Sequence, residues 1–588
     1  MSAVAPSDNL LTEWSRLLFA RLAAAGVREV VVSPGSRSTP FTWAALHTPE
    51  LACHSVQDER AAAFYALGMA RISGRPSLLL CTSGSAPAHY FPAVVEASLA
   101  RVPLLIVTAD RPFELQDVNA AQTVDQTKLY GDFARRFYEL GAPDPSPAAL
   151  SGAARLAEQA VFHARYPDPG PVHLNVRARK PLEPVTAENA LRAMVDALLA
   201  EPARLAPPPE VRAAVVAIAE LAERCRSLQR GLLVAGPAAP GELAALPRLA
   251  EATGFPLLCE ATSQLRFAGG PRGDHLIDAF EPLLRSREQR SRLAPELVIH
   301  FGPPATSSGL EALLASGGIE LHVIARHGFP DPGSRARSVT VGALSDVAER
   351  LIAAGGYDGA ARREFRTRWA SANQAAWRAL ERVGAASAGF CEGAAVRAAV
   401  ESLPRGSLLS LGNSLPVRDV DLFVPAADRG ISVLHQRGAN GIDGLLSGAA
   451  GAGHAFPGPT LLLVGDVAFL HDLGGLELVR RAEKPLVVLV VDNGGGRIFE
   501  QLPLAPHFAG DPALSKFWLT PPGVDFEHAA RAFGIPYAAP TTATELAATL
   551  QGALERRGAT LVHARVVPDS AARDLAAVVA ALEAEAGP

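Results

Sequence analysis

The stretch 460–499, TLLLVGDVAFLHDLGGLELVRRAEKPLVVLVVDNGGGRIF, decides the fold of this 588-residue chain. Its first apolar run, 461–464, ends just before Asp466, and its second, 486–491, ends at the glycine-rich turn 492–496. The segment between the two runs carries apolar residues at helical spacing. Two short apolar runs joined by a helix are typical of a βαβ unit whose parallel strands are buried on both faces.

The polar residues that follow these two strands suit a divalent cation that also holds a diphosphate. In doubly wound sheets, ligands bind beyond the carboxyl ends of the strands, which is where Asp466 and Asn493 fall. Mg²⁺ accepts carboxylate and amide oxygens together with phosphates, and glycines let a backbone approach a phosphate closely. The same residues also occur as plain turns after strands, so the pattern alone leaves both interpretations open.

Composition excludes several classes of protein. With 48% apolar and 20% charged residues, the chain is typical of a large globular protein of about three or four domains. The net charge of −5 predicts no nucleic-acid or membrane partner, and no apolar run approaches the ~20 residues that span a bilayer. The five cysteines are scattered and form no Cys/His cluster, which predicts neither a disulfide framework nor a zinc site. Since the N-terminus does not resemble a signal sequence, we expect a cytoplasmic protein.

The beginning of the chain repeats the organisation of its end. PSLLL at 76–80 matches PTLLL at 459–463, and PLL at 103–105 matches PLV at 485–487. Such self-similarity indicates a duplicated unit. The predicted fold class is therefore α/β, with three doubly wound parallel-sheet domains of which the first and last are an internal repeat. The expected domains are 1–185, 186–355 and 356–588, and no cluster of residues in the middle one predicts chemistry.

The two copies differ in their polar residues. The first has SPGSRS at 33–38, a turn of small residues that presents backbone N–H groups to an anion beside Arg37. Only the first has Glu59 at the start of a helix, where a carboxylate also simply complements the helix dipole. Only the last has the Asp466 and Asn493 pair. This distribution predicts a division of labour between the copies.

Two related α/β domains around a third, with this glutamate on the first and this Asp/Asn pair on the last, resemble the thiamine-diphosphate-dependent enzymes. A closer resemblance is to the family of 2-succinyl-5-enolpyruvyl-6-hydroxy-3-cyclohexene-1-carboxylate synthases of menaquinone biosynthesis. It is carried by SPGSRSTPF (33–41), DERAAAFYALGMA (58–70), CTSGSAPAHYFPAVVEA (81–97), TADRP (108–112), GPVHLNV (170–176), GNSLPVRD (412–419), RGANGIDGLLSGAAG (437–451) and NGGGRIFEQLP (493–503). The resemblance covers essentially the whole chain. It implies a transferase that decarboxylates 2-oxoglutarate and adds the succinyl carbanion in 1,4 fashion to isochorismate.

The resemblance also implies thiamine diphosphate and Mg²⁺ or Mn²⁺ as cofactors. The implied cofactor-binding residues are Glu59, Ser414, Gly438, Ile442, Asp466, Val467, Asn493, Gly495 and Ile498. Of these, Asp466, Asn493 and the carbonyl of Gly495 would bind the metal. Glu59 would share a proton with the pyrimidine N1′, which makes the 4′-amino group a better base. Ile442 would keep the cofactor bent, so that this amino group lies against the reactive carbon.

Both implied substrates carry two carboxylates, and Arg is the side chain best suited to bidentate carboxylate recognition. The implied substrate-binding residues are Ser36, Arg37, Arg111, Gln122, Arg418, Arg437, Ile498, Phe499 and Leu502; the implied catalytic residues are Glu59, Gln122, Arg37, Arg111, Arg418 and Arg437. Each arginine taken alone is equally consistent with a solvated loop residue. Because the family holds its cofactor between subunits, a homodimer or homotetramer is expected.

The chain departs from the family pattern at four places. Asp492 stands where the family has Asn, Ala121 where it has Asn before the substrate glutamine, and Val467 where the wider superfamily has Gly. Ser308-Gly309 stands where a Lys-Arg pair is expected. Two other functions stay open: a different thiamine-diphosphate lyase or synthase acting on small monocarboxylates, and a catalytically silent homologue that only binds a cofactor or a partner.

Overall fold

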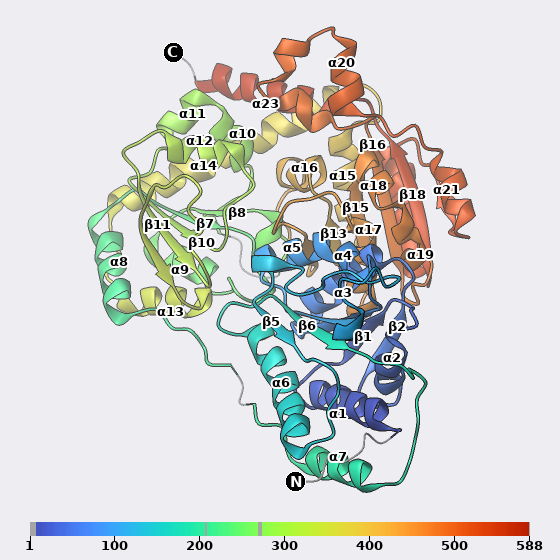
Figure 1. The fold of residues 1–588 in the computed structure, drawn as a ribbon. Helices are drawn as coiled ribbons and strands as arrows, with labels where there is room; N and C mark the ends of the chain where they lie inside the picture. Colours follow the sequence, from blue (N-terminus) through green and yellow to red (C-terminus); the bar gives the residue numbers. More distant parts are fainter. Residues whose placement is uncertain (1–7, 206–207, 269–272, 587–588) are drawn as a thin grey trace.

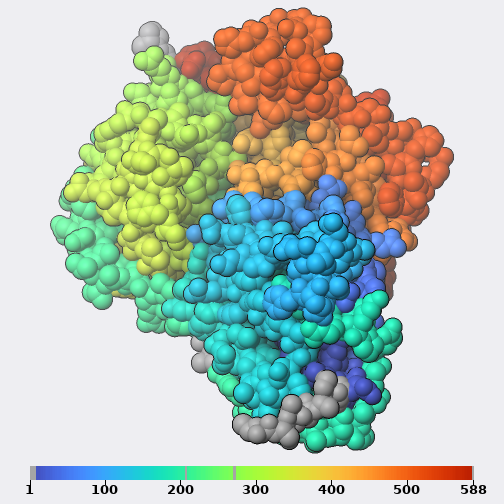
Figure 2. Space-filling model, in the orientation of Figure 1, coloured from blue at the N-terminus to red at the C-terminus, as the bar shows by residue number. Residues whose placement is uncertain are grey.

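Three six-stranded parallel sheets follow one another along the chain in a computed structural model that describes residues 8–205, 208–268 and 273–586 (Figure 1). The predicted fold class is confirmed, and each predicted domain contains one sheet, although the domain boundaries themselves stay a prediction. In Figure 2 the green-to-yellow middle segment and the orange-to-red last segment lie side by side above the blue first segment. No helix in the described ranges is both long and apolar enough to cross a membrane.

The first sheet has the strand order β2-β1-β3-β4-β6-β5. Strands β3, β4 and β6 are buried along their whole length because helices cover both faces of the sheet, as parallel strands require. The strands are β1 Glu29–Val32, β2 Ala52–Ser55, β3 Ser77–Cys81, β4 Leu104–Asp110, β5 Arg136–Glu139 and β6 Pro171–Arg177. The helices are α1 Leu10–Ala24, α2 Thr39–Leu46, α3 Glu59–Ser73, α4 Ala86–His89, α5 Phe91–Ala100, α6 Pro147–Arg165 and α7 Ala190–Ala200.

The last sheet has the order β14-β13-β15-β16-β18-β17, which is the order of the first sheet and confirms the internal repeat. Its strands are β13 Leu408–Leu411, β14 Ser432–His435, β15 Thr460–Gly465, β16 Leu486–Asp492, β17 Tyr537–Ala538 and β18 Ala559–Arg565. Its helices are α15 Glu392–Glu401, α16 Leu415–Phe423, α17 Leu445–Ala455, α18 Asp466–His471, α19 Leu476–Val479, α20 Pro512–Leu514, α21 Phe526–Ala532, α22 Ala543–Glu555 and α23 Ser570–Ala586.

The middle sheet has a different order, β12-β11-β10-β7-β8-β9, so it is not a third copy. Its strands are β7 Gly231–Ala235, β8 Leu257–Cys259, β9 Leu276–Ile277, β10 Leu297–Phe301, β11 Glu320–Ala325 and β12 Ala336–Val341. Its helices are α8 Val215–Ser227, α9 Leu246–Thr253, α10 Phe280–Arg285, α11 Arg287–Arg292, α12 Ser308–Ala315 and α13 Leu344–Ala354. The long helix α14, Ala360–Ala386, buries Trp369 with Val578 and Leu582 of α23, which ties this layer to the end of the chain.

Helices α3 and α17 pack the first and last domains against each other through glycines. A Cβ at Gly68 would lie 2.0 Å from the Gly448 carbonyl oxygen, and one at Gly451 would lie 2.0 Å from the Tyr65 carbonyl oxygen. Since no side chain fits between these backbones, the helices approach as closely as helices can. This seam fixes the position of the loop that precedes α17, and that loop is part of the predicted cofactor site.

The segment between β15 and β16 differs from the single helix that its spacing predicted. It forms α18, a 3₁₀ turn at Leu473–Gly475, and then α19. The interruption begins at Asp472, a fully buried residue whose carboxylate accepts hydrogen bonds from the N–H and hydroxyl of Ser447. A buried carboxylate needs such partners, and reaching them turns the chain inward and ends the first helix.

Candidate active site

The register of the last sheet brings the predicted metal-binding residues together. Gly465 pairs with Val491, so Asp466 lies beside the turn that begins at Asp492. The Asp466 carboxylate is buried and accepts N–H hydrogen bonds from Gly495 at 2.7 Å and Val467 at 2.8 Å. Burial, and then the neighbouring Asp492 charge, raises the pKa of Asp466 to about 6. A cation at this edge of the sheet would remove much of that cost.

The amide of Asn493 is oriented by a residue that sequence reasoning missed. Its Nδ2 donates to Oε1 of Glu392 at 2.6 Å, which leaves its Oδ1 as the end available to a metal. Glu392 is buried at the first turn of α15, and its carboxylate also accepts the N–H of Ala571. It lies 101 residues before Asn493, and no local pattern marks it.

Gly495 occupies a position that only glycine tolerates. Its φ is +128°, and a Cβ there would lie 2.4 Å from the carbonyl oxygen of Leu519. Its own carbonyl accepts the N–H of Arg497 at 2.8 Å and has a second lone pair. A carboxylate, an amide oxygen and a carbonyl at one strand edge form a donor set that fits a hard divalent cation carrying a diphosphate.

The unexpected Asp492 lies next to Asp466, and its charge contributes to the raised pKa of that residue. Oδ2 of Asp492 lies 2.9 Å from Nε2 of His563, and its Oδ1 accepts the N–H of Gly494 at 3.1 Å. The Asp492 carboxylate is therefore hydrogen-bonded to His563 on the neighbouring strand β18.

Glu59 begins α3, and the preceding Asp58 caps that helix by accepting the N–H of Ala61 at 3.1 Å. With Asp58 as the capping residue, Glu59 is not needed for that role. Among the described residues it makes no hydrogen bond or ion pair, so its half-buried carboxyl is available to a ligand. Ile442 packs against the apolar cluster between the two domains, as a residue supporting a cofactor should.

Two arginines of the first domain meet at the carboxyl edge of its sheet. The pairings of β1 with β3 and of β3 with β4 bring their loops together. Arg111 donates to the hydroxyl of Ser83, whose carbonyl accepts the Gln122 side-chain amide at 2.9 Å. Arg37 is buried and donates to the Ala178 carbonyl at 2.6 Å, and its Nε has no partner among the residues that the structure describes. Burial and then the charge of Arg111 lower the pKa of Arg37.

A second arginine pair lies at the corresponding edge of the last domain. Arg418 donates to the Ser414 carbonyl at 2.6 Å, and Arg437 donates to Oδ1 of Asn413 at 3.1 Å. Ser414 has φ +72°, a strained conformation for a non-glycine residue that is often found at functional sites. Burial and then the charge of Arg418 lower the pKa of Arg437. Two partly buried cations at one sheet edge are suited to binding a carboxylate.

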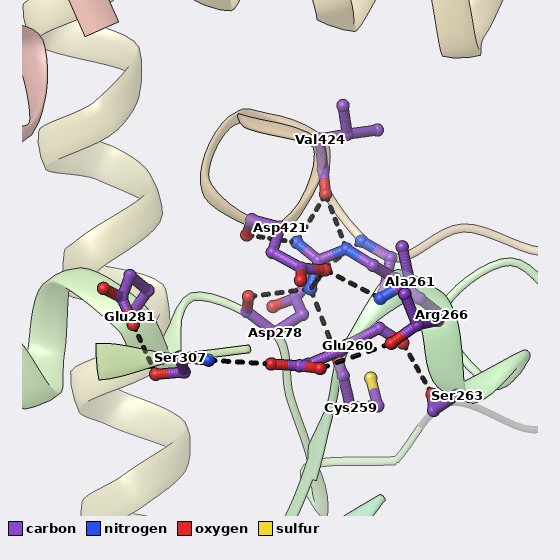
Figure 3. A network of polar contacts seen from close by, with 12 residues as sticks. Cys259, Glu260, Ala261, Ser263, Arg266, Asp278, Glu281, Ser307, Asp421 and Val424 are labelled. Carbon is purple, nitrogen blue, oxygen red and sulfur yellow. Dashed lines mark hydrogen bonds and ion pairs between the residues drawn. The ribbon is translucent and has the colours of Figure 1, made fainter. Parts of the chain in front are cut away.

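Arg418 also lines a small cavity to which the middle domain contributes Glu260, Glu281 and Arg285. Burial and then the charge of Asp421 raise the pKa of Glu260 to about 8. Figure 3 shows Glu260 beside the N–H of Ser307 and shows Asp421 reaching toward Ala261. The sequence predicted no chemistry in the middle segment, yet this segment supplies charged residues next to a predicted substrate arginine.

Comparison with known proteins identifies the family. The model described as "Thiamine pyrophosphate enzyme, N-terminal TPP binding domain" matches residues 12–129, and its C-terminal counterpart matches 431–564. Proteins named 2-succinyl-5-enolpyruvyl-6-hydroxy-3-cyclohexene-1-carboxylate synthase are similar over nearly the whole chain. One from Sorangium cellulosum is 46% identical (96% of this chain, 94% of the relative), one from Halorubrum lacusprofundi 38% (98% of each), and one from Myxococcus xanthus 39% (95% of each). The chain belongs to this synthase family.

The structure explains one departure from the family pattern. Ser308 and Gly309 form the first turn of α12, where Glu281 accepts the Ser308 hydroxyl at 3.1 Å and the Gly309 N–H at 3.2 Å. A Cβ at Gly309 would lie 2.9 Å from Cβ of Leu284. A long cationic side chain at 309 would therefore need the packing of α10 against α12 to change.

Gly438 lies in the loop before α17, where its N–H and that of Ala439 donate to the buried carboxylate of Glu96 on α5. A Cβ at Gly438 would lie 2.6 Å from the Glu96 carbonyl oxygen, so packing already requires glycine there. The remaining predicted residues are placed without a contact that tests their role. Ser36 is exposed, Ile498 and Phe499 are half-buried in the turn Arg497–Gln501, and Leu502 is exposed.

Proposed function

We propose that this chain uses thiamine diphosphate to decarboxylate 2-oxoglutarate and adds the succinyl group to isochorismate. The products are 2-succinyl-5-enolpyruvyl-6-hydroxy-3-cyclohexene-1-carboxylate and CO₂, a step of menaquinone biosynthesis. The observation that carries the proposal is the presence of two arginine pairs, one at the carboxyl edge of each outer sheet. Substrates with two carboxylates need several fixed cations, whereas small monocarboxylates do not.

Bound thiamine diphosphate supplies the electron sink that allows a 2-oxo acid to lose CO₂. We propose that Asp466, Asn493 and the Gly495 carbonyl hold Mg²⁺ or Mn²⁺, and through it the diphosphate. Glu59 holds a proton at the pyrimidine ring, and this role is supported by its lack of any partner among the described residues. Ile442 orients the cofactor from the seam between the domains.

The arginines bind and orient the substrates. Arg37 has a buried Nε with no partner, and a buried N–H is costly unless a ligand accepts from it. Arg111 and Gln122 are both anchored on Ser83, so they form one rigid unit at the same edge. We assign the carboxylates to these groups and to the Arg418 and Arg437 pair.

The active form is proposed to be a homodimer or homotetramer with the cofactor between subunits. The support for this proposal is the family resemblance, which places the cofactor between subunits. A second chain would bring a Glu59 to each diphosphate site.

The test follows the ultraviolet absorbance of isochorismate in the presence of enzyme, thiamine diphosphate and Mg²⁺, with and without 2-oxoglutarate. Consumption is expected to need both substrates and to collapse in Glu59→Gln, a variant that keeps the side-chain volume. If 2-oxoglutarate loses CO₂ while isochorismate is untouched, the acceptor assignment is wrong. If neither substrate reacts although the cofactor binds, the chain is the silent homologue.

A further inference from the structure

A cluster of three metal-binding side chains lies outside the proposed active site. Glu29, His54 and His454 each place one potential ligand atom so that all three atoms lie within 4.8 Å of one another. They come from three elements: the start of β1, the edge strand β2 and the last turn of α17. His454 lies 400 residues beyond His54, so the sequence gives no sign of the cluster.

The first two ligands are aligned by the sheet. Val31 pairs with His54, and Glu29 lies two residues before Val31 on the same face of β1. Nε2 of His54 lies 2.7 Å from Oε2 of Glu29.

The third ligand arrives through the glycine seam. Gly451 contacts the backbone of Tyr65, and His454 follows one helical turn later on the same side of α17. The imidazole rings of His54 and His454 are 4.7 Å apart, centre to centre, at an angle of 78°.

Two further side chains flank the cluster. Lys484 lies near His454, but its ammonium donates to the backbone carbonyls of His454 and Phe456. The Tyr65 ring is 5.8 Å from that of His54 and closes one side. A tetrahedral ion with bonds of ~2.0–2.1 Å needs its ligand atoms ~3.3 Å apart. Side-chain rotations that move the ligand atoms by about 1 Å would complete this geometry.

We propose that Glu29, His54 and His454 bind a zinc-class transition metal ion that clamps the edge of the first domain to the end of α17. Two imidazoles, one carboxylate and a water make up a four-coordinate nitrogen and oxygen site. The ion would thus bridge the first and last domains of one chain, because α17, which directly follows the loop that contains Ile442, belongs to the last domain. This site is independent of the proposed function.

The test is a Co²⁺ titration of the full-length protein after chelator dialysis. Thiamine diphosphate and excess Mg²⁺ are present so that the diphosphate site is filled. One further Co²⁺ per chain is expected to bind with the visible absorption of a four-coordinate site, and Zn²⁺ should displace it. Changes to groups that merely support ligands weaken metal affinity about 10–100-fold, so His54→Gln and His454→Gln should weaken it at least tenfold.

The matched control is His47→Gln, which changes an exposed histidine of the same domain that stacks on Trp43 and should leave binding unchanged. Zn²⁺ should also raise the thermal midpoint of the wild type but not that of His454→Gln, whose exposed position allows it to fold. The proposal is overturned if no Co²⁺ binds at micromolar concentration, which would leave only the Glu29–His54 ion pair. It is also overturned if both histidine variants keep the wild-type affinity.

Discussion

Replacing Glu392 tests whether the orientation of Asn493 controls the metal site. In Glu392→Ala the 2.6 Å hydrogen bond from Asn493 is lost, and the amide can rotate and point its N–H₂ end at the cation. Loss of groups that orient a metal ligand weakens metal affinity about 10–100-fold, equivalent to ~1.4–2.7 kcal/mol at ~1.36 kcal/mol per tenfold. Loss of a single hydrogen bond to a charged group, ~1.5–3 kcal/mol, gives the same range independently.

The assay is a Mg²⁺ titration of activity at saturating thiamine diphosphate, with circular dichroism to confirm folding. Glu392→Gln is the matched control, because its side-chain oxygen can still accept from Asn493, and its Mg²⁺ half-saturation should stay within a few-fold of wild type. The Mg²⁺ half-saturation of Glu392→Ala should rise at least tenfold. A value within twofold of wild type in a folded Glu392→Ala protein would refute the orienting role and, with it, the assignment of the Asn493 oxygen as a ligand.

Three other predictions concern the same two sheet edges. Gly495→Ala should abolish activation by thiamine diphosphate, because its Cβ would meet the Leu519 carbonyl at 2.4 Å and φ is +128°; near-normal cofactor binding by calorimetry would contradict this. Burial and then the charge of Asp492 raise the pKa of Asp466 from 3.8 to about 6. Between pH 3.8 and about 6 the folded apoprotein therefore binds more protons than the unfolded chain, and its stability falls as the pH rises. A metal must displace that proton, so Mg²⁺ half-saturation should rise about tenfold per pH unit below pH 6 and stay level above it, as Mg²⁺ titrations from pH 5 to 8 would show. Arg111→Lys keeps the charge but loses the planar fork, so the KM for one dicarboxylate should rise about tenfold with a smaller change in kcat; unchanged steady-state constants would remove Arg111 from the site.

The fold followed from local patterns because buried parallel strands leave a strong signal. The apolar runs 461–464 and 486–491 became β15 and β16, and the similarity of 76–80 to 459–463 corresponds to two sheets of identical strand order. The short β9 and the half-exposed β12 leave no such signal, since neither forms a continuous apolar run. The broken helix at Asp472 was missed because its partner, Ser447, lies on another helix.

The site was predictable where its residues follow strands and unpredictable where they arrive from elsewhere. Asp466 and Asn493 are placed by the β15–β16 register, which their flanking apolar runs already imply. Glu392 and Glu260 come from segments with no motif, and only their burial against Asn493 and Asp421 reveals them. Their effect depends on contacts that no spacing rule encodes.

The sequence by itself determined the class of fold and the internal repeat, and it predicted the residue types proposed to bind a diphosphate and carboxylates, because each of these is encoded in short segments by periodicity and turn chemistry. Only the tertiary structure decided which groups that are distant in sequence contact one another. Examples are Glu392 orienting Asn493, Glu96 holding the Gly438 loop, and His454 reaching Glu29 across the glycine seam. The physical reason is that hydrogen-bond energies and pKa values depend on distances of a few ångströms, and those distances are fixed by packing between elements hundreds of residues apart.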